Sequence, residues 1–160
     1  MFKMISLALF ILMLQGCSTV EQTTGISLGN QETTLTITLK AAADINPDLN
    51  NKPSPVLVRL FFLTARSNFD NSSYDVLFNK ADGGLAGEFL TVRDILLVPG
   101  SQQELKLEQN EQVAFIGVVA GYRQLDAIRW RDAILATKSS ILGKANLEVQ
   151  VGAQAVRIVD

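Results

Sequence analysis

Alternation of polar and apolar positions is the clearest structural signal in the chain. In residues 34–40, leucine and isoleucine alternate with threonine, a pattern typical of a half-buried strand. The apolar face of this predicted strand carries Leu35, Ile37 and Leu39. A shorter alternation in residues 104–108 follows the turn at Pro99 and Gly100 and predicts another strand.

Two longer runs are apolar on both faces and are predicted to be buried. Residues 56–63, VLVRLFFL, are interrupted by a single arginine, which favours a central strand covered on both sides or one that continues into a barrel-like corner. Residues 113–122 are rich in β-branched side chains and are flanked by polar turns. At the end of the chain, residues 147–151 and 156–159 predict a hairpin about Gly152.

Helical spacing is confined to two short segments. Apolar side chains in residues 72–79 recur three and four positions apart, and Asp70 or Asn71 is the expected N-cap. The second predicted helix runs from Trp130 to Thr137, with Ile134 facing inward. About six strands with short helical insertions predict an all-β domain over residues 33–160, an antiparallel β-sandwich.

The chain begins with the features of a secretory signal peptide. Lys3 gives a charged start, and an uncharged apolar run follows from Met4 to Leu14. This run is shorter than the roughly 20 apolar residues that a helix needs to cross a bilayer. We therefore expect residues 1–16 to be removed, which leaves a mature chain of 144 residues.

Cys17, the only cysteine in the chain, directly follows this segment. Leu14, Gly16 and Cys17 resemble a bacterial lipobox, in which a small residue precedes the cleavage site and the cysteine thiolate accepts a diacylglyceryl group. The freed amine would take a further acyl chain, and two or more chains hold a protein stably on a membrane. Ser18 in the next position resembles the signal that sorts lipoproteins to the outer membrane. The alternative is that Cys17 merely closes an ordinary signal peptide.

Residues 17–32 are predicted to be a flexible tether. They are rich in threonine, serine, glycine and glutamine and have no apolar period. As a random coil, this segment would have a reach of about 20 Å. An early edge strand around Ile26 and Leu28 is the alternative.

Composition and charge narrow the function. The net charge of −2, or −3 after removal of Lys3, argues against a nucleic-acid partner, which would require a clustered basic surface. The absence of histidine excludes Ser-His-Asp and Cys-His sites and removes the commonest metal ligand. The glycines of residues 83–87 lack the lysine and hydroxyl of a phosphate loop. We therefore expect no cofactor, no metal and no catalysis, although two distant carboxylates can still meet in space.

The connection at residues 44–54, DINPDLNNKPS, is the most informative loop. With Pro55, it carries three of the chain's four prolines, so that its backbone is partly fixed in advance. A pre-organised loop loses less entropy on binding, but prolines also protect a plain crossover between sheets. Trp130, with Arg123 and Arg131 nearby, presents a similar choice: an interface hot spot or a cap on one end of the sandwich.

A family resemblance emerges from the order of these features. A lipobox followed by PVLVRLFFL, FDNSSYDVLF, LVPG and IGVVAGYRQLDAIRWR resembles the TssJ family of outer-membrane lipoproteins of type VI secretion systems. The resemblance implies a transthyretin-like sandwich that is anchored by lipidated Cys17 to the periplasmic face of the outer membrane. It also implies binding to the periplasmic domain of the inner-membrane protein TssM.

In that family the loop between the first two strands contacts TssM. The matching positions here are Asp44, Ile45, Asn46, Pro47, Asp48, Leu49, Asn50, Asn51, Lys52, Pro53 and Ser54. The main alternative is a different envelope lipoprotein that uses a similar sandwich to bind a ligand or partner. An enzyme is the third hypothesis and has no recognisable motif to support it.

Overall fold

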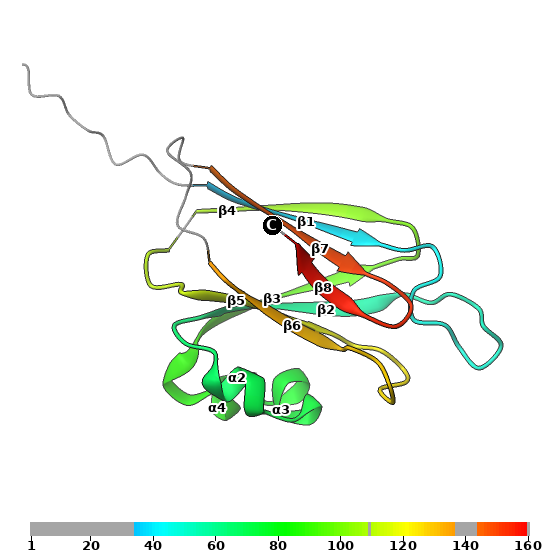
Figure 1. Cartoon of the computed structure of the whole chain (residues 1–160), viewed down its shortest axis with the longest axis horizontal. Coiled ribbons are helices and arrows are strands. Elements are labelled where there is room, and N and C mark those ends of the chain that lie inside the picture. Colours follow the sequence, from blue (N-terminus) through cyan, green and yellow to red (C-terminus); the bar gives the residue numbers. More distant parts are fainter. Residues whose placement is uncertain (1–33, 109, 137–143, 160) are drawn as a thin grey trace, which may run out of the picture. The chain divides into compact units, whose positions relative to one another are not determined.

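The computed structural model describes residues 34–108, 110–136 and 144–159 (Figure 1). The predicted signal peptide, Cys17 and the tether lie outside the described residues. No helix in these ranges is long and apolar enough to cross a membrane.

Eight strands form two sheets of four. One sheet, here called the β1 sheet, has the order β4-β1-β7-β8, and the other, the β2 sheet, has the order β3-β2-β5-β6. The two sheets lie face to face in Figure 1, which confirms the predicted sandwich. The strand bounds are β1 (Thr34–Ala41), β2 (Val56–Leu63), β3 (Phe89–Leu97), β4 (Gln102–Glu108), β5 (Phe115–Ala120), β6 (Arg131–Leu135), β7 (Lys144–Val151) and β8 (Val156–Val159).

The predicted strand faces are confirmed. Leu35, Ile37 and Leu39 of β1 are all buried between the sheets. Strand β2 lies in the middle of its sheet, between β3 and β5. Its side chains alternate between two separate clusters, with Leu60 in the core between the sheets and Phe61 in a second core on the outer face. The run is apolar on both faces because both faces are covered.

The pairing of β1 differs from the prediction of a wholly antiparallel sandwich. Strand β1 pairs antiparallel with β4 but parallel with β7, with Thr38 opposite Glu148. Between these two strands the chain builds the whole β2 sheet, so it can re-enter the β1 sheet from the same end. Parallel neighbours need such a long crossover connection, and the sequence pattern of a strand does not encode its direction.

The predicted helix from Trp130 to Thr137 is wrong. Residues 131–135 form strand β6, which pairs antiparallel with β5 and places Ile134 opposite Ile116. Ile134 packs against the inter-sheet core, as expected of an inward-facing residue. In so short a segment, helical and extended spacing are hard to distinguish, and the free edge of β5 offers backbone hydrogen bonds that decide the outcome.

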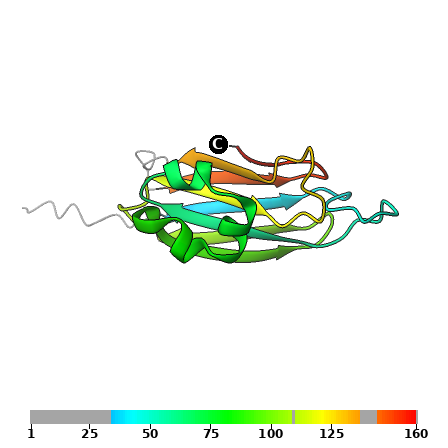
Figure 2. The same cartoon turned by 90° about the horizontal axis from the view of Figure 1, so that it is seen from below.

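Three short helices and a 3₁₀ turn cover the outer face of the β2 sheet (Figure 2). They are α2 (Ser67–Asn71), α3 (Tyr74–Asn79), α4 (Ala81–Gly84) and η2 (Ala86–Glu88). Helix α3 confirms the predicted helix, but its N-cap is Ser73, which accepts a hydrogen bond from the Val76 N–H at 3.4 Å. The predicted cap Asp70 instead pairs with Arg66 inside α2. Strand β3, which follows the helices, was not predicted because its edge position leaves most of its side chains partly exposed.

The helical layer is held on the sheet by specific contacts. Arg59, the one charged residue in β2, donates hydrogen bonds to the carbonyl oxygens of Leu77 and Phe78 at the end of α3 and pairs with Asp94 at 2.8 Å. Cations near a helix C-terminus are favourable because the last carbonyls lack intrahelical partners. Gly117 is needed beneath α2, since a Cβ there would lie 2.7 Å from the Phe69 ring.

Candidate partner-binding surface

The β1–β2 loop projects from one end of the sandwich and has an internally bonded tip (Figure 1). One carboxylate oxygen of Asp48 accepts hydrogen bonds from the N–H groups of Asn50 and Lys52, at 2.8 and 2.9 Å. The Asp48 N–H donates to the Lys52 carbonyl, and the Asn51 N–H donates to the Asp48 carbonyl, both at 2.9 Å. These bonds to the charged form lower the pKa of the Asp48 carboxyl. The tip is therefore a closed turn.

The neck of the loop is fixed by Asn46, which is buried with 4% of its surface exposed. Its Nδ2 donates to the Pro55 carbonyl at 2.7 Å, and its Oδ1 accepts from the Arg123 N–H at 2.8 Å. One side chain thus joins both ends of the loop to the β5–β6 connection. The backbone of Asn46 has φ 46°, a left-handed conformation that asparagine tolerates better than most residues.

The predicted partner-contact positions therefore divide into two groups. Ile45, Asn46 and Ser54 are buried, and Ile45 belongs to the core between the sheets. They support the loop from below. The exposed positions are Asp44, Leu49, Asn50, Asn51, Lys52 and Pro53, with Pro47 and Asp48 half-buried.

Leu49 is the most exposed large apolar side chain in the described part of the chain, with 90% of its surface accessible. Sequence analysis included it in the loop without singling it out. An isolated leucine among polar loop residues was the available signal, because apolar side chains without a core partner are informative when they are held in place.

Two hollows flank the loop. The first, of about 520 Å³, lies between the loop, the β5–β6 connection and the β7–β8 turn. The second, of about 620 Å³, is lined by Leu49, Asp48 and Arg123 among others. Arg123 is therefore part of the same surface as the loop.

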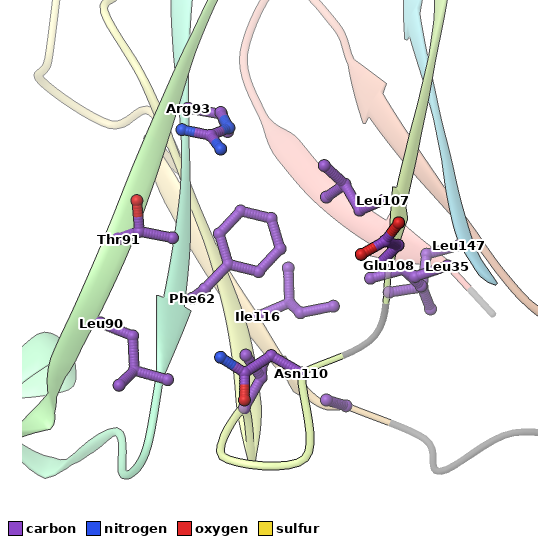
Figure 3. A pocket seen from close by; sticks show the side chains of 12 residues that line it. Leu35, Phe62, Leu90, Thr91, Arg93, Leu107, Glu108, Asn110, Ile116 and Leu147 are labelled. Carbon is purple, nitrogen blue, oxygen red and sulfur yellow. The ribbon is translucent and has the colours of Figure 1, made fainter. Parts of the chain in front are cut away.

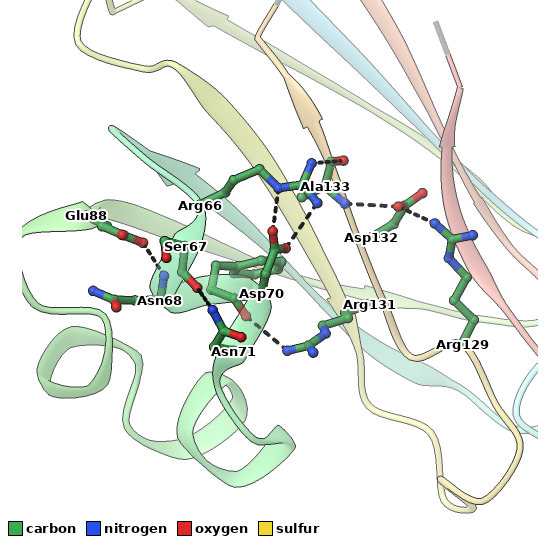
Figure 4. A network of polar contacts seen from close by, with 11 residues as sticks. Arg66, Ser67, Asn68, Asp70, Asn71, Glu88, Arg129, Arg131, Asp132 and Ala133 are labelled. Atoms are coloured by element: carbon green, nitrogen blue, oxygen red, sulfur yellow. Dashed lines mark hydrogen bonds and ion pairs between the residues drawn. The ribbon is translucent and has the colours of Figure 1, made fainter.

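Trp130 and Arg131 belong to a different part of the molecule. Trp130 packs edge-on against Tyr74 of α3, with ring centroids 5.3 Å apart, and the Arg131 guanidinium lies 4.7 Å from the Trp130 ring centroid. Arg131 also donates hydrogen bonds to the carbonyls of Phe69 and Ser72, at 3.0 and 2.7 Å (Figure 4). These contacts attach the helical layer to β6, so Trp130 sits beneath the helices and not at an end of the sandwich.

An apolar cavity of about 130 Å³ lies between the sheets at their other end (Figure 3). Phe62 and Ile116 line it from the β2 sheet, and Leu35 and Leu147 line it from the β1 sheet. Its polar lining consists of Thr91, Arg93, Glu108 and Asn110. In the described ranges, no three Asp, Glu, His or Cys side chains lie close enough to hold a metal ion.

Comparisons with known proteins agree with this architecture. Residues 33–154 match the family model described as type VI secretion lipoprotein, VasD, EvfM, TssJ. No curated protein sequence matches the chain. The fold is similar to the crystal structure of the type VI secretion lipoprotein TssJ1 from Pseudomonas aeruginosa, with 30% identity over 80% of this chain and 95% of that one and a TM-score of 0.74.

Two further solved structures share the fold at lower identity. Serratia marcescens Lip, a membrane-bound component of the type VI secretion system, is 20% identical over 81% of this chain and 99% of that one, with a TM-score of 0.74. A chain in a structure of the TssM C-terminal domain from EAEC is 21% identical over 79% of this chain and 98% of that one, with a TM-score of 0.63. With the family model spanning nearly the whole described domain, this protein belongs to the TssJ family of type VI secretion lipoproteins.

Proposed function

We propose that this protein joins the outer membrane to the periplasmic domain of TssM in a type VI secretion membrane complex. Residues 1–16 act as a lipoprotein signal peptide, lipidated Cys17 is the anchor on the periplasmic face of the outer membrane, and residues 17–32 are the tether. The β1–β2 loop is the contact with TssM. The protein has no catalytic role in this proposal.

The observation that carries the proposal is an exposed leucine on a pre-ordered loop. Leu49 is 90% exposed, yet hydrogen bonds from Asp48 fix the turn that carries it and Asn46 fixes the neck. Burying a leucine side chain contributes about 1.5–3 kcal/mol. Because the loop is already ordered, little of that gain is lost in conformational entropy on binding.

The binding test uses Leu49→Ala and the purified periplasmic domain of TssM in isothermal titration calorimetry. We expect the dissociation constant to rise at least tenfold, which corresponds to about 1.4 kcal/mol. Leu135→Ala is the matched control, because Leu135 is also exposed, at 60%, but lies on β6. Equal affinity of the Leu49→Ala variant and the wild type would refute the role of this side chain.

A loop replacement extends the test to the other exposed positions. Residues 48–52 are replaced by a Gly-Ser-Gly link, which leaves Ile45, Asn46 and Ser54 in place. Replacement of the whole loop would remove Ile45 from the core and confuse binding with folding. We expect loss of binding with an unfolding temperature close to that of the wild type, since surface loops tolerate changes in length.

The anchor is tested separately with Cys17→Ser. Without the thiol, no diacylglyceryl group can be attached. We expect the variant to leave the outer-membrane fraction for the soluble periplasm or to remain uncleaved. Fractionation like that of the wild type would contradict lipid anchoring through Cys17.

A further inference from the structure

The hollow of about 520 Å³ beside the β1–β2 loop has a one-sided charge. Two carboxylates, those of Asp44 and Asp126, line it, and the remaining lining residues include no lysine or arginine. Neither carboxylate has a hydrogen bond or ion pair with any other residue that the structure describes, although six ion pairs occur elsewhere in those residues. The negative charges at this hollow are therefore left uncompensated by the protein.

The walls of the hollow are tied together by hydrogen bonds between its three segments. The buried Tyr122 hydroxyl donates to the Gly152 carbonyl at 3.0 Å, which joins the β5–β6 connection to the β7–β8 turn. The Arg129 N–H donates to the Gln154 carbonyl at 3.0 Å. Asn46 joins the same connection to the β1–β2 loop. The two carboxylates are thus carried on segments held at fixed separations.

Unusual backbone conformations gather at the same place. Within the described ranges, four residues other than glycine have positive φ, and three of them line this hollow: Asn46, Asn51 and Ala127. Ala127, at φ 59°, has no side-chain hydrogen bond to offset the cost of about 1–2 kcal/mol. Such conformations persist where the surroundings hold them, and they concentrate at functional sites.

The charge changes sign across the loop. The hollow on the other side contains Arg123, whose guanidinium forms no ion pair among the described residues, and Leu49 stands between the two sides. Charge complementarity across an interface steers association and sets orientation. A partner that receives Leu49 must therefore place positive charge against one side of the loop.

We propose that the hollow between Asp44 and Asp126 receives a lysine or arginine side chain of the protein that binds the β1–β2 loop. This inference rests on the proposed function and adds the chemistry and orientation of the contact. The cationic side chain would lie beside the pocket that takes Leu49, and the two contacts together would fix the rotation of the partner about the loop.

The test compares an Asp44→Asn, Asp126→Asn double variant with the wild type in binding to the TssM periplasmic domain. Both residues are exposed and unpaired, so we expect an unchanged unfolding temperature. We expect the affinity at about 0.1 M salt to fall about tenfold. The wild type should weaken as salt rises to about 1 M, where the Debye length falls from about 10 Å to about 3 Å, and the double variant should respond much less.

A Glu108→Gln, Glu111→Gln double variant is the matched control. It removes the same charge from β4 and the loop that follows it, which lie at the opposite end of the sandwich, and we expect its binding and salt response to match the wild type (Figure 1). An equal loss in the control would mean that only net charge matters, and would overturn the inference.

The outcome separates this inference from the proposed function. If the double variant binds like the wild type while Leu49→Ala loses affinity, the loop is the interface and the hollow is outside it. If both variants bind like the wild type, the loop interface itself is wrong. Reduced affinity and a reduced salt response, seen only in the Asp44→Asn, Asp126→Asn variant, support the cationic contact.

Discussion

Replacement of Asn46 should show how strongly the loop neck is held. In Asn46→Ala, the Pro55 carbonyl and the Arg123 N–H both lose their partner. Leaving a buried polar group unsatisfied costs about 1–3 kcal/mol. Because Pro55 and Arg123 are exposed residues and water reaches part of the freed groups, we expect a total loss of about 2–4 kcal/mol.

Two companion variants separate the causes of this loss. Asn46→Gly removes the same hydrogen bonds but accepts the left-handed backbone at φ 46°, so it should be about 1 kcal/mol less destabilising than Asn46→Ala. Asn46→Asp keeps an acceptor for the Arg123 N–H but turns an oxygen toward the Pro55 carbonyl. That repulsion is relieved when the new carboxyl is protonated, so its pKa should be raised in the folded state.

The raised pKa has a definite consequence for stability. A folded state that holds a proton more tightly than the unfolded state loses stability as pH rises from the unfolded pKa, about 3.9, through the folded value. The deficit of Asn46→Asp relative to the wild type should therefore be small near pH 3 and largest at neutral pH.

The assay is urea denaturation of the mature domain, with the free energy of unfolding compared at a constant slope m. Affinity for the TssM periplasmic domain is measured on the same preparations, and Asn46→Ala should reduce it because the loop is no longer held. A loss below about 0.5 kcal/mol for Asn46→Ala, or equal stability of the alanine and glycine variants, would refute the account of the neck.

Other predictions address the core and the loop tip. Phe62→Ala should cost about 3–5 kcal/mol, because Phe62 is 5% exposed in the inter-sheet core, whereas Thr36→Ala on the polar face of β1 should cost about 1 kcal/mol or less in the same denaturation assay; equal costs would mean that the face assignment is wrong. The pKa of Asp48 is lowered by its backbone hydrogen bonds from Lys52 and Asn50, so the order it gives the tip is fully present above its unfolded pKa of about 3.9 and is lost as pH falls through the lower folded value. Amide exchange of Asn50 and Lys52 should therefore be slow at neutral pH and accelerate, relative to the intrinsic rate, only below about pH 4, and an Asp48→Asn variant should not show this change.

Where partner strands and hydrogen bonds are far apart in the chain, sequence patterns could not specify the structure. The segment after Trp130 was predicted as a helix because its apolar spacing is ambiguous, and the free edge of β5 made it a strand. Asn46 appeared only as one polar loop residue, because its partner Arg123 is 77 positions away. The unpaired carboxylates Asp44 and Asp126, 82 positions apart in the chain, share a hollow only after both sheets have formed.

The sequence by itself determined the faces of the main strands, the insertion of short helices and the loop that projects from the sandwich. Side-chain alternation in β1 and the apolar run of β2 report burial directly, because the two faces of a strand meet different surroundings whatever its neighbours are. The tertiary structure alone decided the parallel pairing of β1 with β7, the division of the loop into buried support and exposed tip, and the charged hollow beside it. Those features depend on contacts between distant segments, which local periodicity does not record.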